Sequence, residues 1–510
     1  MFSTSARAQL KIGTNSPRQK LQIAEMAIKE LYVDTVDENT LVENAIRGMV
    51  EKLDPHSAYT TPKQTNEMNE PLQGSFEGIG VQFNMSQDTL LIIQPVTGGP
   101  SEKVGILAGD RIVSVNDSAI AGVKMSKEDI MKRLRGKKGT KVRLGIIRRG
   151  IKNVLPFTVT RDKIPVTTID ASYMIKPSVG YIRIGSFGET TYNEFMSAVD
   201  SLKTHGMKNL ILDLQENGGG YLLTAAKIAN EFLQDGDLIV YTQGRRSQRE
   251  DYTAHGTGRF REGKVVVLVN EYTASAAEIV TGAIQDQDRG EVVGRRSFGK
   301  GLVQRPIPFS DGSMIRLTIA HYYTPSGRCI QKPYTKGDTE DYADDIENRF
   351  KHGELYSADS IHFNDSLKYY TLRKHRVVYG GGGIMPDYFV PLDTSQYSKY
   401  YRQIAARSYI INSNLKYIDN NRKRLKNMYR SFEEFNRDFV IPQSVVDEII
   451  AEAKKDKIEP KDDAELQQTL PYLKLQLKAL VARDLWGMSQ YFEIMNTQSH
   501  VVQRAMKLFN

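Results

Sequence analysis

A serine and a lysine with unusual neighbours are the residues of this chain best suited to chemistry. Ser275 stands in E-Y-T-A-S-A-A-E-I (271–279), just ahead of a helical pattern, and Lys300 stands between two glycines in S-F-G-K-G-L-V-Q (297–304). A hydroxyl is a poor nucleophile until a base removes its proton, and a lysine can act as that base when burial keeps it uncharged. The pair predicts a serine–lysine hydrolase, most simply a peptidase.

Each segment also has a plainer interpretation. S-A-A-E fits a capping box, in which Ser275 only caps a helix and Glu278 reaches back to it. G-R-R-S-F-G-K-G matches a phosphate-binding loop, but Gly301 replaces the Ser/Thr that binds magnesium and the next residues are typical of a strand. S-x-x-K at 297–300 is the penicillin-recognising motif, but the glycines disfavour its helix and its partner motifs are missing. A base delivered from a loop to Ser275 is the interpretation that remains.

A glycine-rich segment, Q-E-N-G-G-G (215–220), lies between a predicted strand and a predicted helix. It has the composition of a simple connector. The same position suits backbone N–H groups that stabilise an oxyanion, because glycine lets the backbone approach a substrate closely.

Composition narrows the class of protein. The 510 residues predict several domains, and 40% hydrophobic with 25% charged residues is ordinary for a soluble globular protein. No apolar run of about 18 residues predicts a membrane span, and the first residues lack the apolar core of a signal peptide, so a cytoplasmic protein and a trimmed mature form are both open. The single Cys329 excludes an internal disulfide framework, and the eight histidines show no metal-binding spacing. We therefore expect no metal and no cofactor.

The net charge of +8 raises the question of nucleic acid. The densest basic block runs from Lys124 to Lys163 and resembles turns and exposed strand faces without interleaved aromatic residues. A solvated basic face is the favoured interpretation, so no nucleic-acid partner is expected. Attraction to an acidic partner or an anionic membrane surface stays open.

The periodicity of the chain predicts four parts. Residues 1–73 have helical spacing, 74–160 form a compact strand-rich module, and 161–395 alternate strands with helices around a polar insertion at 331–376. From 396 to 510 the chain is helical again. The β-α-β alternation predicts a largely parallel sheet covered by helices, with ligands bound where loops leave the carboxyl ends of the strands.

Together these segments resemble the C-terminal processing peptidases, also called tail-specific proteases. The resemblance covers residues 20–330 and resumes at G-I-M-P-D (383–387). Its landmarks, in order, are L-D-P-H-S-A-Y, G-I-G-V-Q-F, L-I-L-D-L-Q-E-N-G-G-G, T-A-S-A-A-E-I, S-F-G-K-G-L-V-Q and Y-Y-T-P-S-G-R-C-I-Q. It implies a multidomain α/β fold: a crotonase-like protease core, an inserted PDZ-like domain and helical regions at both ends.

The resemblance also assigns roles at the site. It makes Ser275 the nucleophile, Lys300 the general base and Gln304 the residue that orients the lysine. The oxyanion hole would use the backbone N–H of Ala276 and that of one glycine of 218–220, first of all Gly219. The activity optimum is then expected on the alkaline side, because the base must lose its proton.

The PDZ-like module would capture the substrate. Its loop Gly78, Ile79, Gly80 and Val81 would bind a terminal carboxylate through backbone N–H groups while the peptide adds as a strand. The expected partners are proteins or peptides with free, apolar C-termini. The resemblance places the chain in the periplasm or cell envelope. Peripheral envelope association and a homo-oligomer are both compatible with the sequence.

The chain departs from the family pattern at three positions. Gln215 and Gly218 stand where the family usually has Arg and Pro, and Ala277 replaces a common serine. Two other functions compete with the peptidase: a catalytically inactive PDZ scaffold that binds protein C-termini, and an acyl-thioester enzyme of the crotonase type. Intact Ser275, Lys300 and Gln304 disfavour the scaffold, and the PDZ-like module disfavours the thioester enzyme.

Overall fold

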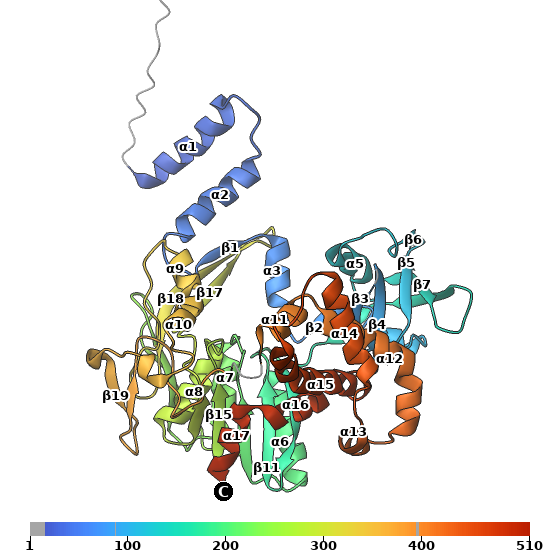
Figure 1. Ribbon diagram of the computed structural model, residues 1–510. Coiled ribbons are helices and arrows are strands. Elements are labelled where there is room, and N and C mark those ends of the chain that lie inside the picture. The colour runs from blue at the N-terminus through green and yellow to red at the C-terminus, as the bar shows by residue number, and fades with distance from the viewer. Residues whose placement is uncertain (1–15, 87, 394–396, 510) are drawn as a thin grey trace, which may run out of the picture. The chain divides into compact units, whose positions relative to one another are not determined.

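A computed structural model describes residues 16–86, 88–393 and 397–509 (Figure 1). The chain forms two compact units, each built from several separate segments. The first unit joins the chain up to Thr65 with Gln304–Ile319 and Tyr334–Asp344. The second unit holds Asn66–Val303, Ala320–Pro333 and the chain from Asp345 onward.

The first unit contains the helices α1 (Pro17–Leu31) and α2 (Glu38–Val50) and a strand that local periodicity did not predict. Ser16 caps α1 by accepting a hydrogen bond from the N–H of Gln19, and Pro17 fits the first helical position. The strand β1 (Ala58–Thr60) pairs antiparallel with Met314–Arg316, in β18 (Met314–Tyr323). The region predicted as helical therefore contains a strand, because its partner lies far along the chain.

The landmark L-D-P-H-S-A-Y forms the turn that leads into β1. The buried carboxylate of Asp54 accepts hydrogen bonds from the N–H groups of His56 and Ser57, each at 2.9 Å, and from the hydroxyls of Ser57 and Thr318. The ring of His56 contacts the hydroxyl of Tyr342, in the part of the insertion that belongs to this unit, at 2.9 Å. This landmark thus forms an organised turn ahead of β1.

A six-stranded, mostly parallel sheet is the centre of the second unit (Figure 1). In spatial order its strands are β10 (Ile169–Lys176), β11 (Val179–Ile184), β12 (Asn209–Asp213), β15 (Val265–Val269), β16 (Glu291–Gly294) and β21 (Tyr388–Phe389). Only the β10–β11 pair is antiparallel. The helices that alternate with these strands are α6 (Thr191–Thr204), α7 (Leu222–Asn230) and α8 (Ala276–Asp286). The predicted alternation of strands and helices is confirmed.

The two faces of this sheet pack against different helices, because successive strand residues point to opposite sides. Leu210 and Leu212 belong to the core shared with α6, α7 and α8. Ile211, between them, belongs to a second core that includes Val501 and Val502 of α17 (His500–Met506). The helix α17 therefore completes the core on this face of the six-stranded sheet.

The strand-rich module has the expected compact form. Its main sheet runs in the order β3 (Val81–Ser86), β4 (Thr89–Pro95), β5 (Arg111–Val115), β7 (Lys141–Ile147) and β8 (Leu155–Thr160), with β6 (Ser118–Ala119) beside β5. Two short helices, α4 (Pro100–Lys103) and α5 (Lys127–Leu134), accompany it, and β2 (Ser75–Gly78) pairs with β9 (Asp162–Pro165) at its entry and exit. One apolar cluster fills its interior.

The remaining strands form a sheet with β18, and the insertion follows β18 along the chain. β13 (Leu238–Gln243) and β14 (Glu250–Thr253) form a hairpin that pairs with the end of β18, and β17 (Leu302–Pro308) pairs with β18 as well. The insertion contains α9 (Glu340–Ala343), α10 (Asp345–Lys351), two 3₁₀ turns, and the strand β19 (Lys368–Tyr370), which pairs with β20 (Val377–Tyr379). It is polar and partly helical, as predicted.

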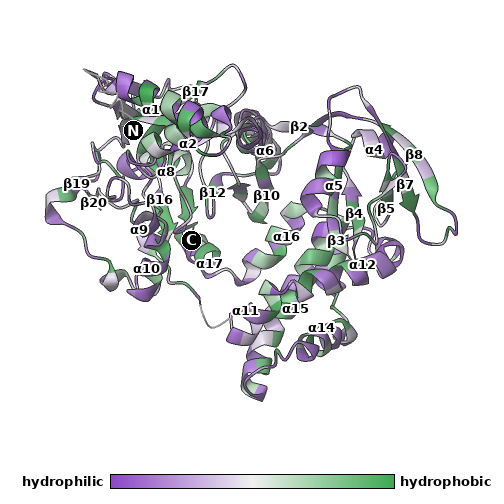
Figure 2. Ribbon diagram, turned by 90° about the horizontal axis from the view of Figure 1, so that it is seen from above, coloured by the Kyte–Doolittle hydropathy of each residue, from purple (hydrophilic) through white to green (hydrophobic). Residues whose placement is uncertain are grey.

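The C-terminal region is helical, as predicted, and has its own apolar core. Its helices are α11 (Lys399–Ala406), α12 (Tyr409–Met428), α13 (Phe432–Asp438), α14 (Gln443–Lys455), α15 (Asp463–Leu485) and α16 (Met488–Met495). Helix α16 lies beside β10 (Figure 2), and α12 contacts the strand-rich module through an ion pair of 2.7 Å between Asp419 and Arg111. Among the described residues, no helix has both the length and the apolar character that crossing a membrane requires.

Candidate active site

Three loops that leave neighbouring parallel strands form the candidate site. They are the glycine loop (Gln215–Gly220) after β12, the serine turn (Asn270–Ser275) after β15 and the lysine loop (Arg295–Gly301) after β16. The N–H of Ala274 donates to the carbonyl of Asn217 at 2.9 Å, and the N–H of Phe298 donates to the carbonyl of Thr273 at 2.9 Å. All three loops are thus hydrogen-bonded together at the carboxyl edge of the sheet, where the alternation predicted a ligand.

Ser275 occupies a strained turn at the start of α8. Its backbone has φ 57° and ψ −117°, a conformation that residues other than glycine rarely adopt. Ala276 and Ala277, which follow it, are buried, whereas Ser275 itself is partly exposed. The turn presents the serine at the amino end of a fully buried helix, whose dipole favours negative charge there.

Glu278 holds this turn in place. One oxygen of its carboxylate accepts a hydrogen bond from the N–H of Ser275 at 2.8 Å, as a capping box requires. The same oxygen accepts the N–H of Lys300 at 2.9 Å, and the other oxygen accepts the N–H of Gly299 at 2.8 Å and the hydroxyl of Ser297 at 2.6 Å. A single buried carboxylate therefore binds both the serine turn and the lysine loop.

Burial has a second effect on this carboxylate. The side chain of Glu278 has no exposed surface, and burial raises the pKa of its carboxyl above the ordinary value, while its hydrogen-bond donors act in the opposite direction. The capping interpretation of S-A-A-E is thus correct for Glu278, but capping is only part of its role.

The segment that carries Lys300 is a loop and not a helix. Lys300 is partly exposed, its neighbour Gly299 has φ 89°, and β17 begins at Leu302. No helix follows the lysine, so the phosphate-loop and penicillin-recognising interpretations both lack the helix they need. A Cβ at Gly299 would lie 2.8 Å from the N of Gly383, which explains a glycine at this position.

The glycine loop surrounds the serine closely. A Cβ on Gly219, which has φ 98°, would lie 2.7 Å from the Cβ of Ser275 and 2.9 Å from the N of Ala276. The N–H of Gly219 itself donates to the side-chain oxygen of the buried Asn217 at 2.8 Å. An oxyanion bound by this N–H would therefore share it with the side-chain oxygen of Asn217. In the described ranges, by contrast, no acceptor contacts the N–H of Ala276 or of Gly218.

Gln304 lies in the first unit, whereas Ser275 and Lys300 lie in the second. Its side-chain amide donates to the carbonyl of His56, at the end of the Asp54 turn. The role of Gln304 in orienting the lysine stays a prediction.

Family models match most of the chain in four pieces. Residues 178–341 match peptidase family S41, 78–159 match the PDZ domain, and 3–64 match the N-terminal domain of the activating protease CtpB. Residues 400–487, in the C-terminal helices, match a family of unknown function (DUF8443).

Curated relatives decide the family. The carboxy-terminal processing protease CtpA of Bacillus subtilis is 38% identical over 353 residues, which cover 67% of this chain and 74% of the relative. The chain belongs to the carboxy-terminal processing proteases. CtpB of the same organism is 33% identical over 366 residues, covering 71% of this chain and 74% of CtpB. The solved photosystem II D1 C-terminal processing protease is 30% identical and covers 61% of this chain and 90% of its own, with a TM-score of 0.34.

In this processing protease the PDZ loop is tightly built. The carbonyl of Ile79 accepts hydrogen bonds from both the N–H and the hydroxyl of Ser101, and the carbonyl of Gly80 accepts from the N–H of Val96. Gly80 has φ 71°, and a Cβ there would lie 2.9 Å from a methyl carbon of Ile164. Gly78, Ile79 and Gly80 are buried, and Val81 is partly exposed.

The family landmark Y-Y-T-P-S-G-R-C holds the far end of α8. Asp286, the last residue of that helix, accepts the side chains of Thr324, Ser326 and Arg328, and its ion pair with Arg328 at 2.6 Å has no exposed surface. At the other end of the helix, the hydroxyl of Tyr322 donates to the carbonyl of Ser275 at 3.1 Å. Through these bonds the landmark anchors both ends of α8, the helix that begins next to Ser275.

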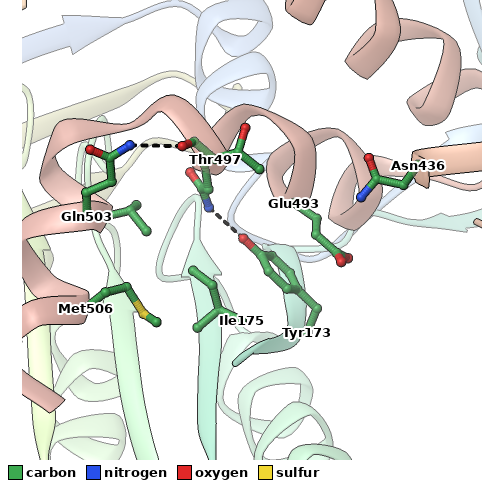
Figure 3. A pocket seen from close by; sticks show the side chains of 9 residues that line it. Tyr173, Ile175, Asn436, Glu493, Thr497, Gln503 and Met506 are labelled. Carbon is green, nitrogen blue, oxygen red and sulfur yellow. Dashed lines mark hydrogen bonds between the residues drawn. The ribbon is translucent and has the colours of Figure 1, made fainter. Parts of the chain in front are cut away.

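A cavity lies between the protease sheet and the tail helices (Figure 3). It measures about 400 Å³ and is lined by Tyr173 and Ile175 of β10, by Asn436, Glu493, Asn496 and Thr497 of the tail, and by Val502, Gln503 and Met506 of α17. The amide of Asn496 donates to the hydroxyl of Tyr173 at 2.7 Å. Burial raises the pKa of the Glu493 carboxyl to about 7, and the nearby Glu433 adds to the shift. Among the described residues there is no group of three acidic, histidine or cysteine side chains that could hold a metal ion.

Local sequence patterns indicated the serine and the lysine but not the side chains that fix their loops. The capping-box spacing indicated Glu278 as a helix cap, but not its bonds to the lysine loop. Arg349, in the insertion, contacts the lysine loop without any local pattern that could have indicated it.

Proposed function

We propose that this processing protease is a serine endopeptidase that cuts proteins near their C-termini with a Ser275–Lys300 dyad. The observation that supports this most directly is the carboxylate of Glu278, which accepts the backbone N–H groups of both Ser275 and Lys300. Because this carboxylate binds both loops through backbone groups, it fixes the serine turn and the lysine loop relative to each other. The strained turn at Ser275 is a second support, since such strain concentrates at functional sites.

The proposed reaction is acyl transfer. The hydroxyl of Ser275 attacks the scissile carbonyl while the neutral amine of Lys300 takes its proton. The oxyanion is stabilised by the N–H of Ala276, at the amino end of α8, and by a backbone N–H of the glycine loop. Lys300 then protonates the leaving amine, and a water molecule hydrolyses the acyl-enzyme. Gln304 is proposed to orient the lysine.

The PDZ domain is proposed to select the substrate. An apolar C-terminal tail would add as a strand to β3, with its carboxylate at the N–H groups of the Gly78–Val81 loop. The carbonyls of Ile79 and Gly80 are engaged within the domain, which favours N–H groups that face a ligand. We also propose that the protein acts in the periplasm or cell envelope, which fractionation of cells that express it would test.

The test is digestion of a folded protein that carries an unstructured apolar C-terminal tail. We expect wild-type protein to shorten it, and both Ser275→Ala and Lys300→Ala to lose activity by at least about a thousandfold, because a nucleophile and its base act as a unit. Lys227→Ala, on an exposed position of α7, is the matched control and should cleave normally.

The outcomes separate the competing functions. Cleavage that persists in Lys300→Ala would refute the dyad. Binding of the tail without cleavage by wild-type protein would favour the PDZ scaffold. A substrate whose tail ends in an amide instead of a carboxylate tests the PDZ assignment separately: unchanged KM for that substrate would contradict carboxylate capture.

A further inference from the structure

The insertion reaches the lysine loop through a buried arginine. Arg349 lies in α10 and is 2% exposed. Its guanidinium donates to the carbonyl of Ser297 at 2.8 Å and to the carbonyl of Phe298 at 3.0 Å. These two peptide groups lie just ahead of Gly299 and Lys300, so the arginine contacts the backbone that presents the lysine.

The first residues of the insertion contact the same loop. The N–H of Lys332 donates to the carbonyl of Gly299 at 2.8 Å, and the N–H of Gly301 donates to the side chain of Gln331 at 2.8 Å. The ammonium group of Lys332 lies 4.1 Å from the ring centre of Phe298. The insertion therefore binds the lysine loop at several successive peptide groups.

One carboxylate joins the two cations of this contact. Asp345, the first residue of α10, lies 3.0 Å from the ammonium of Lys332 and 2.9 Å from the guanidinium of Arg349. Lys332 is 3% exposed. Because buried charges are tolerated only when they are paired, this trio forms a fixed unit rather than a mobile surface cluster.

The lysine loop needs such support. Glycines on both sides of Lys300 give the loop little conformational preference of its own. Its N–H groups at 299 and 300 are bound by Glu278, and its carbonyls at 297, 298 and 299 are bound by Arg349 and Lys332. The loop is thus held from both sides, and its conformation comes from these partners.

We propose that Arg349 is a positioning residue, which holds the lysine loop so that the amine of Lys300 stays within reach of the Ser275 hydroxyl. This rests on the proposed Ser275–Lys300 dyad. Arg349 acts through the backbone and does not touch the substrate. The planar guanidinium matters because it binds two carbonyls at once, which a lysine at this position cannot do in the same way.

The test compares Arg349→Met and Arg349→Lys with the control Arg373→Met, in the full-length protein. Arg373 belongs to the same insertion but is half exposed and pairs with Asp237, away from the lysine loop. We expect Arg349→Met to lower kcat by at least about tenfold with KM changed less than about twofold, since a misplaced base affects the chemical step. Arg349→Lys should recover part of the activity, and Arg373→Met should behave as wild type.

The pH profile is the readout that a purely structural role would not change. A loosened loop exposes the Lys300 amine to water, which favours its charged form, so the rising limb of the kcat/KM profile, where the base loses its proton, should move to higher pH in Arg349→Met. Thermal unfolding of each variant shows the fraction that is folded. If Arg349→Met fails to fold, Asp345→Asn weakens the same trio from a more exposed position and should shift the profile in the same direction.

Two outcomes would overturn the inference. The first is an Arg349→Met protein that is less stable but keeps the wild-type kcat and pH profile. The second is an Asp345→Asn protein with an unchanged profile when Arg349→Met does not fold. Lys300→Ala, assayed alongside, separates this from the dyad itself. An active Lys300→Ala protein refutes the dyad, whereas an inactive one beside a normal Arg349→Met protein refutes only the positioning role.

Discussion

At the scale of single residues, the geometry of the site depends on a side chain that does not react. Glu278 is buried in the first turn of α8 and accepts four hydrogen bonds, two on each oxygen. It compensates for the unusual backbone of Ser275 by giving its N–H a charged acceptor. The positions of Ser275 and Lys300, the proposed nucleophile and base, are thus linked through one carboxylate rather than set independently.

Glu278→Gln should therefore damage both stability and activity. An amide NH₂ in place of either oxygen faces two donors, and each buried donor left without an acceptor costs about 1–3 kcal/mol. We expect a lower melting temperature and a kcat/KM reduced by on the order of a hundredfold, because a small misplacement of catalytic groups has effects of that size.

The matched control is Glu231→Gln. Glu231 is also buried, at the carboxyl end of α7, where it accepts from Tyr192 and from the N–H of Arg259. It should lower the melting temperature without changing the activity of the folded protein. Equal loss of activity in both variants would mean that Glu278 contributes only to stability.

At the scale of elements, the helices after α15 belong to the protease sheet as much as to the tail. Residues of α17 fill one face of that sheet, and α16 lies against β10. In this packing the ring of Phe492, in α16, lies 4.7 Å from the guanidinium of Arg183, whose other partners include Asp213 and the carbonyl of Gln215. Through Arg183 the tail thereby contacts the first residue of the glycine loop.

The cavity beside α16 makes the stability of this packing depend on pH. Glu493 has a pKa of about 7 in the folded protein, chiefly because of burial and secondly because of Glu433. Its ordinary value is near 4.5. The folded state thus holds the proton more tightly than the unfolded state, and stability is lost as pH rises from about 4.5 to 7.

Glu493→Gln removes that titration. The variant should melt at a higher temperature than wild type at pH 8 and at nearly the same temperature at pH 4.5, measured by thermal unfolding in matched buffers. Glu452→Gln, on the exposed side of α14, should differ little from wild type at either pH. A Glu493→Gln protein that is less stable at pH 8 would show that the carboxylate is stabilising there.

At the scale of the whole molecule, the tail also contacts the PDZ domain, within the second unit. Asp419 and Asn420 of α12 pair with Arg111 and Arg149, and Arg422 donates to the carbonyl of Ile93 at 3.2 Å. Region 400–487, which matches a family of unknown function, is therefore joined to the PDZ domain. A charged contact of this kind restrains the domain without an extensive apolar interface.

Charge reversal tests that contact. Arg111→Glu should weaken it by about 1 kcal/mol, because the pair is only partly buried, and Arg111→Glu with Asp419→Arg should restore it. Hydrogen exchange of the β5 amides in the full-length protein measures the effect. Lys416→Glu, which breaks an exposed pair with Glu448 inside the tail, is the control and should leave β5 unchanged. Equal exchange in Arg111→Glu and wild type would show that the contact contributes nothing.

Local patterns predicted much of this fold and less of what holds the site. The alternation after residue 161, the strand-rich module and the tail helices follow from periodicity that neighbouring residues carry. β1 has only three residues and pairs with β18, so no local window could indicate it. The capping-box spacing indicated the bond between Glu278 and Ser275, but the contacts that Glu278 and Arg349 make with the lysine loop join segments distant in sequence and leave no trace in local spacing. The family resemblance supplied the roles of the site residues, but not their supports.

The discontinuous first unit has a consequence for biosynthesis. Thr60 and its strand partner Met314 are 254 residues apart, and chains are made at roughly 5–20 residues per second. For roughly ten to fifty seconds a nascent β1 has no partner, while Ser275 is translated before Lys300, Arg349 and the tail exist. A ribosome-bound chain therefore passes through a period in which its serine turn is present without Lys300, the proposed base. On the proposed mechanism, the order of the segments leaves the active site incomplete until these later segments have been made.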